Sequence, residues 1–87
     1  MLHTVELVEQ ALALAQQCGF GVRQDWLAGG RSGGCELKGQ KWIFLDLGLS
    51  PLEQLDVIIS ALEEVEIPET LAIPGTLSEV IASRKAA

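Results

Sequence analysis

Hydrophobic residues in the first part of the chain recur at the spacing of an amphipathic helix. The apolar positions lie three or four residues apart, at Val5, Val8, Leu12 and Ala15. This is the period of an α-helix with one buried face. Thr4 is suited to cap the start of such a helix, and Gly19 is suited to end it in a left-handed conformation. The pattern therefore predicts a helix from Thr4 to Cys18.

Alternating apolar and polar positions replace this helical period in segment 20–26. Such alternation is typical of a short strand, here one that directs Phe20, Val22 and Trp26 toward the core. Segment 28–34 follows with four glycines. Because glycine gives the backbone unusual freedom, this composition predicts a loop or a bulged entry into the next strand.

A β-hairpin is predicted between residues 35 and 46. The runs 35–38 and 41–46 flank Gly39 and Gln40, which would form the turn. The second run contains Trp42 and other residues with a strong preference for strands. Together with segment 20–26, these runs predict a three-stranded, largely antiparallel sheet.

The strongest local signal marks the start of a second helix. Ser50 can cap the free N–H groups, Pro51 suits the first helical position, and Glu53 can complete a capping box. The buried stripe of this helix is expected to comprise Leu52, Leu55, Ile58, Ile59, Leu62 and Val65.

A short terminal helix is expected after a segment interrupted by Pro68 and Pro74. Residues 76–79 repeat the capping-box pattern with Thr76 as the cap, and Arg84 and Lys85 fall at the far end, where positive charge is favourable. The resulting order is α-β-β-β-α-α. It predicts an α+β fold with a small, mainly antiparallel sheet packed by helices.

Length and composition suggest one folded domain spanning residues 1–87. Hydrophobic residues make up 48% of the chain and charged residues 21%, which is typical of globular proteins and not of disordered ones. We expect no signal peptide or membrane span, because acidic and polar residues interrupt the apolar stretches. Cys18 and Cys35 lack the spacing of a disulfide framework. These features favour a cytoplasmic location with both thiols reduced.

The charge is negative overall but unevenly distributed. A net charge of −6 argues against nucleic acid as a partner, because binding to a phosphate backbone relies on many Lys and Arg residues. Segment 20–45 nevertheless has an excess of basic residues, whereas segment 42–83 contains eight acidic residues and no Lys or Arg. The sequence therefore predicts a protein with one basic and one acidic side.

The glycine-rich segment and the cysteines offer little recognisable chemistry. A phosphate-binding loop would end in Lys-Ser/Thr and lead into a helix, whereas a strand is expected to follow this glycine-rich segment. His3, Cys18 and Cys35 are too few and too widely spaced for a structural zinc site, so we expect no cofactor. Cys35 is still a candidate reactive thiol, because Arg31 and Lys38 would favour its thiolate. The sequence shows no evident general base for this thiol.

Charged and aromatic residues provide the more plausible interaction surface. Acidic residues cluster at the end of the second helix, where the helix dipole makes negative charge mildly unfavourable. A solvated face that keeps the protein soluble explains them adequately; the alternative is a contact surface for a basic partner. The candidate interaction residues are Arg31, Lys38, Lys41, Trp42, Glu63, Glu64 and Glu66, with Trp26 as another apolar anchor.

Four segments carry a resemblance to known proteins: 18–23 (CGFGVR), 33–39 (GGCELKG), 42–46 (WIFLD) and 49–54 (LSPLEQ). Together they resemble a small uncharacterised bacterial family of about this length, which implies no activity. More distantly, residues 19–65 resemble the core of minimal zinc metallopeptidases of the ImmA/IrrE type.

The catalytic motif of those metallopeptidases does not carry over. Their HExxH motif supplies two zinc-binding histidines and a glutamate that activates water. The corresponding helix contains no histidine, and only Glu63 or Glu64 could stand near the catalytic carboxylate. The resemblance thus implies a related layout without peptidase activity.

Two hypotheses of function follow from the sequence. The first is a non-enzymatic interaction or regulatory module that self-associates or binds a protein through the hairpin, the glycine-rich segment and the acidic second helix. The alternative is a small-ligand-binding or thiol-dependent enzyme domain that uses Cys35 and Arg31.

Overall fold

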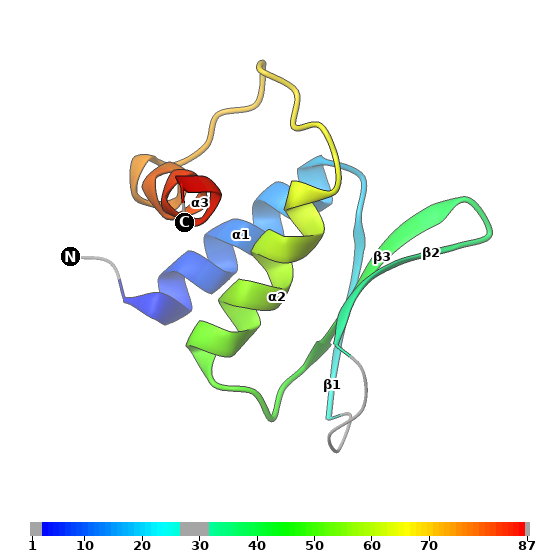
Figure 1. The fold of residues 1–87 in the computed structure, drawn as a ribbon. Coiled ribbons are helices and arrows are strands. Elements are labelled where there is room, and N and C mark those ends of the chain that lie inside the picture. Colours follow the sequence, from blue (N-terminus) through cyan, green and yellow to red (C-terminus); the bar gives the residue numbers. More distant parts are fainter. Residues whose placement is uncertain (1–2, 27–31, 87) are drawn as a thin grey trace.

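The computed structural model describes residues 3–26 and 32–86. Its elements follow the expected order, which confirms the α+β fold (Figure 1). They are α1 (Thr4–Gln17), β1 (Gly21–Asp25), β2 (Gly33–Leu37), β3 (Gln40–Asp46), α2 (Pro51–Glu63) and α3 (Gly75–Ala86). In the part of the chain that the structure describes, no helix is both long enough and apolar enough to cross a membrane.

The sheet is mixed, with β3 at its centre and the order β1-β3-β2. β2 pairs with β3 in the antiparallel sense, as the hairpin predicts, whereas β1 pairs with β3 in parallel. Two reversals of the chain explain the parallel pair: β2 runs against β1, and the hairpin then turns β3 back into the direction of β1. Both β1 and β2 are therefore edge strands.

The hairpin turn lies one residue earlier than the sequence pattern predicts. β2 extends to Leu37 and β3 begins at Gln40, so Lys38 and Gly39 form the turn. Both turn residues have positive φ, 52° at Lys38 and 80° at Gly39. This combination suits a two-residue turn whose twist matches that of the strands, and glycine adopts it without steric cost.

In the part of the chain that the structure describes, the helices cover one face of the sheet. Figure 1 shows α1 and α2 side by side against this face, with α3 beyond them. α2 packs on β2 and β3, while α1 packs on β1 and contacts α3. The side chains that fill the core are Leu7, Val8, Ala11, Leu14, Ala15, Phe20, Ile43, Leu45, Leu55, Ile58, Ile59, Ala61, Leu62 and Leu77.

The three helix starts agree only in part with the expected caps. The capping box of α2 is confirmed: the Glu53 N–H donates to Ser50 Oγ (3.2 Å), and the Ser50 N–H donates to Glu53 Oε1 (3.0 Å). Thr4, by contrast, is already helical, and His3 precedes it without a side-chain cap. The prediction of Thr76 as a cap is also wrong, because α3 begins at Gly75.

Three apolar residues that were expected to face the core lie largely in solvent. Val5 and Leu52 are 53% and 69% exposed, since each occupies the first turn of its helix, where fewer neighbours cover the apolar stripe. Trp26 follows the last residue of β1 and is 72% exposed. Phe20 is buried and Val22 is partly buried, as predicted.

Candidate binding groove between β2 and α2

A groove runs between the edge strand β2 and helix α2. Its volume is about 800 Å³, and both elements contribute to its walls. On the strand side it is lined by segment 32–36, and on the helix side by residues from Asp56 to Glu66. The groove therefore occurs where α2 lies over β2, which among the described strands pairs with β3 alone.

The backbone of β2 offers hydrogen-bonding groups to this groove. Leu37 and Gln40 flank the two-residue turn and face each other, which makes them a hydrogen-bonded pair. Because such pairs alternate along an antiparallel ladder, the N–H and C=O groups of Cys35 also point toward β3. Those of Gly34 and Glu36 point the other way. Within residues 3–26 and 32–86, no strand pairs with this outer edge.

The floor of the groove is apolar. Val57 and Ala61 lie one turn apart on α2, and Val65 lies four residues further on, just beyond the C-cap residue Glu64. The two valines are partly buried, and Ala61 is buried against β2. At the closest approach, a Cβ atom added to Gly34 would lie 3.0 Å from the Cβ of Ala61. Glycine at this position thus allows β2 to approach α2.

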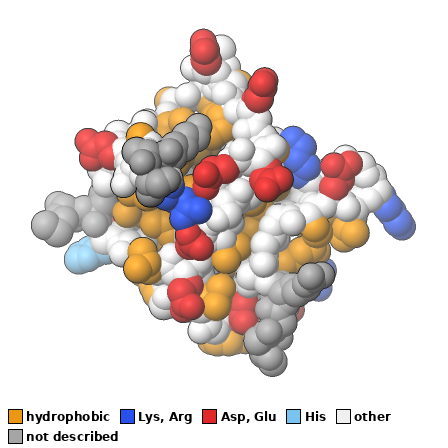
Figure 2. Space-filling view, in the orientation of Figure 1, with side chains coloured by type: hydrophobic (Ala, Val, Ile, Leu, Met, Phe, Trp, Pro, Cys, Tyr) orange, Lys and Arg blue, Asp and Glu red, His pale blue; other side chains and the backbone are white. Residues whose placement is uncertain are grey.

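The rim of the groove is predominantly acidic. Glu36 on β2, Glu64 at the end of α2 and Glu66 beyond it are exposed and line the groove. Among the described residues that line the groove, Lys41 is basic, and its Nζ lies 5.7 Å from the centre of the buried Phe20 ring. Figure 2 shows acidic side chains across the helical side of the molecule. A positively charged ligand therefore meets complementary charge here.

Arg84 of α3 engages another set of polar residues on α2. Its guanidinium forms a hydrogen-bonded ion pair with Asp56, donates to Ser60 Oγ (2.9 Å) and bonds Glu63 Oε1 (3.1 Å). The hydrogen bond to Asp56 raises the pKa of Arg84 further above its already high value. Asp56 and Glu63 thereby take part in the contact between α2 and α3, whereas the rim acids Glu36, Glu64 and Glu66 are exposed to a ligand in the groove.

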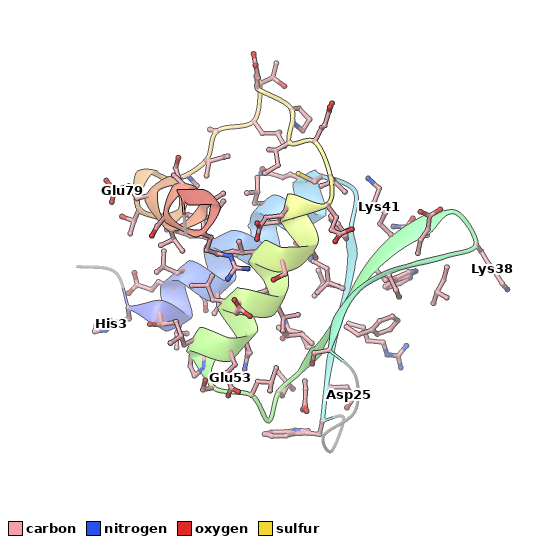
Figure 3. The ribbon with its side chains drawn as sticks, in the orientation of Figure 1. His3, Asp25, Lys38, Lys41, Glu53 and Glu79 are labelled. Carbon is pink, nitrogen blue, oxygen red and sulfur yellow. The ribbon has the colours of Figure 1, made fainter. Side chains whose placement is uncertain are left out.

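The structure separates several residues that the sequence analysis grouped together. Lys38 lies at the hairpin tip, away from the helices, whereas Lys41 lies near the end of α2 (Figure 3). Trp42 is on the opposite face of the sheet, where it stacks on Phe44 with ring centres 6.2 Å apart and covers Gly21. The predicted role of Arg31 lies outside the described residues.

The two cysteines differ in their surroundings. Cys35 is exposed on β2, and Cys18 is partly buried at the end of α1. Burial raises the pKa of the Cys18 thiol, an effect that nearby Lys41 partly offsets. Across residues 3–26 and 32–86, no group of three or more His, Cys, Asp or Glu side chains is placed to hold a metal ion. A thiol-dependent activity of Cys35 stays a prediction.

Sequence reasoning recognised part of this groove and overlooked the rest. Glu64, Glu66 and Lys41 were singled out by charge, but Val57 and Ser60 carried no signal of their own. Their spacing from Ala61 and Glu64 places them on the groove side of α2. That side of the helix lines a groove because β2 lies beside it, and the sequence does not reveal this position of β2. No family model, curated protein or solved structure matches the chain. The family resemblances accordingly stay predictions.

Proposed function

We propose that this chain is a protein-interaction module that binds a basic, extended segment of a partner protein in the groove between β2 and α2. The observation that carries this proposal is the combination of an apolar floor with an acidic rim along an edge strand. An extended segment fits a groove beside a strand better than a folded surface does, because its side chains project into the space on both sides of its backbone.

Basic side chains match both parts of the groove. The aliphatic stems of Lys and Arg can lie along Val57 and Val65, while their charged ends reach the carboxylates of Glu64 and Glu66. An acidic segment would meet like charge at the rim, and a purely apolar one would leave the carboxylates without a partner. The same charges would speed association with a basic partner at low ionic strength.

Self-association through this groove is less well supported. Each copy carries a net charge of −6, and a second β2 strand would bring its own Glu36 toward the acidic rim. Like charges that face each other oppose such pairing. Basic residues such as Lys38 and Lys41 could offset this repulsion, and native mass spectrometry of the purified protein tests for self-association.

The proposal is tested by the binding of a short fluorescein-labelled peptide in which lysine and valine alternate, followed by fluorescence polarisation. We expect saturable binding that weakens as NaCl is added, because salt screens exposed charges. The double variant Glu64→Gln/Glu66→Gln should bind at least about fivefold more weakly, because it removes both carboxylates from the rim.

A matched control uses an acid remote from the groove. Glu79 is exposed on α3 and lies far from β2 (Figure 3). Glu79→Gln changes net charge in the same direction, and Glu6→Gln/Glu79→Gln matches the double variant in charge. If the control weakens binding as much as the groove variant, the peptide responds to overall charge. That result, or no binding at all, would refute the proposed function.

A further inference from the structure

We infer that the partner segment binds as an additional β-strand along the outer edge of β2, with basic side chains at alternate positions and small or β-branched apolar side chains between them. This inference rests on the proposed function and goes further, because it specifies how the partner's backbone is held and which sequence pattern is recognised.

The backbone argument comes from the register of the hairpin. The outward N–H and C=O groups of Gly34 and Glu36 form a short row that faces the groove. An edge of this kind is a template for another strand, unless side chains or a covering segment block it. Gly34 has no side chain, and the groove beside Glu36 is open. An added strand could therefore form a regular ladder on β2.

The side-chain argument follows from the two faces of the sheet. Gly34 and Glu36 are opposite Ile43 and Lys41, and the burial of Ile43 shows that this set faces the helices. Positions of an added strand that share this face would lie above the apolar floor and within reach of Glu64. A long basic side chain can pack its aliphatic stem on the apolar floor while its charged end reaches Glu64.

The intervening positions of an added strand would lie on the other face. There the neighbours are Cys35 and Leu37 of β2, and Trp42 of β3 lies directly across from Cys35. Leu37 is 52% exposed, and Trp42 and Phe44 are only partly buried. Apolar β-branched residues pack well against such a surface and favour extended backbone.

The groove would therefore recognise the alternation of basic and apolar residues along the partner segment. Because side chains on a strand alternate between faces, a shift by one residue would exchange the two sets. Basic groups would then lie over Leu37 and Trp42, and apolar groups would face the acidic rim. A segment with the same composition but with its lysines in one block cannot place them all on the α2 side.

The first experiment compares two peptides by isothermal titration calorimetry. Both contain equal numbers of lysines and valines; in one they alternate, and in the other all lysines precede all valines. We expect the alternating peptide to bind at least about tenfold more tightly, which corresponds to about 1.4 kcal/mol. Equal affinities would leave the groove as a basic-peptide site but would overturn strand addition.

The second experiment removes an outward backbone donor from β2. Glu36→Pro lacks the N–H that points away from β3, and proline is tolerated at such edge positions. Glu36→Thr loses the same charge but keeps the donor, so it is the matched control. We expect Glu36→Pro to weaken binding several-fold relative to Glu36→Thr. Equal affinities for these two variants would contradict the inference.

A third measurement does not depend on how the variants fold. Two alternating peptides are N-methylated, one at every lysine and the other at every valine. Only one of these two sets of amides can face β2. If the peptide runs antiparallel to β2, the lysine amides face it; if the peptide runs parallel, the valine amides do. One methylated peptide should therefore lose binding while the other keeps it. Equal loss in both peptides, or binding by both, would overturn strand addition.

Discussion

Gly34 of β2 lies against Ala61 of α2 so closely that a Cβ atom at Gly34 would be 3.0 Å from the Cβ of Ala61. Contacts this short force neighbouring atoms apart, and here the neighbour is a short side chain fixed to the helix backbone. This contact sets the spacing of the edge strand and the helix, and hence the width of the groove between them.

Enlarging Gly34 should therefore destabilise the protein. We expect Gly34→Val to lower the free energy of unfolding by about 1–3 kcal/mol, as overpacking usually does. Ala61→Gly should lower it by about 1 kcal/mol, because glycine weakens a helix. The double variant should be more stable than the sum of the two effects predicts, since Ala61→Gly makes room for the valine. Urea unfolding of all four proteins checks this, and strict additivity would contradict the contact.

The caps of α1 and α2 give a direct comparison of two hydroxyl residues. Ser50→Ala should cost about 1 kcal/mol, because it removes the side-chain acceptor of the capping box. Thr4→Ala should have a much smaller effect, because Thr4 is the first residue of α1 and His3, not Thr4, occupies the N-cap position. Urea unfolding of the two variants at neutral pH measures both. Similar losses for Ser50→Ala and Thr4→Ala would mean that the helix starts are wrongly placed.

The capping box also makes a prediction about pH. Hydrogen bonds from Ser50 lower the pKa of Glu53 below its ordinary value of 4.5, which approximates the unfolded chain. The carboxylate therefore stabilises the fold above pH 4.5, and this contribution is lost as the pH falls through the lower pKa of the folded state. Glu53→Gln should unfold with a weaker dependence on pH over that window. An unchanged pH profile would show that the carboxylate contributes nothing; Glu79→Gln is the control.

Arg84 should hold α3 against α2. Arg84→Met keeps much of the aliphatic stem but removes the interactions with Asp56, Ser60 and Glu63. We expect the free energy of unfolding to fall by roughly 1 kcal/mol or less, with a smaller difference in high salt, because the ion pairs are partly exposed. Amide exchange in α3 should quicken while that in α2 changes little. Ser83→Ala is the control, and unchanged exchange in α3 would mean that Arg84 does not hold α3 against α2.

The order of helices and strands was predictable because each segment carries its own periodicity or cap. The four residues Ser50-Pro51-Leu52-Glu53 are enough to predict the start of α2, and the structure confirms it. The parallel pairing of β1 with β3 was not local, because it depends on how two separate reversals of the chain combine. The sequence pattern places the turn one residue too late, at Gly39 and Gln40, because lysine rarely adopts the positive φ that Lys38 has in the structure.

The candidate site was harder to predict for a similar reason. Charge alone indicates Glu63, Glu64 and Glu66 as one acidic cluster. In the structure, Glu63 forms an ion pair with Arg84 of α3, while Glu64 and Glu66 line the groove. Trp42 was expected to anchor the same surface, yet strand alternation places it on the opposite face from Ile43. The sequence indicated which residues were unusual, and tertiary packing determined which of them share a surface.

Amide hydrogen exchange followed by NMR, with and without the alternating lysine–valine peptide, shows whether a bound segment pairs with the outer edge of β2. In the free protein, the amides of Gly34 and Glu36 should exchange faster than those of Cys35 and Leu37, which pair with β3. Saturation with peptide should slow exchange at Gly34 and Glu36 while leaving the helix cores unchanged. If the peptide binds and these two amides exchange as fast as before, the partner does not add to β2, and the account is wrong.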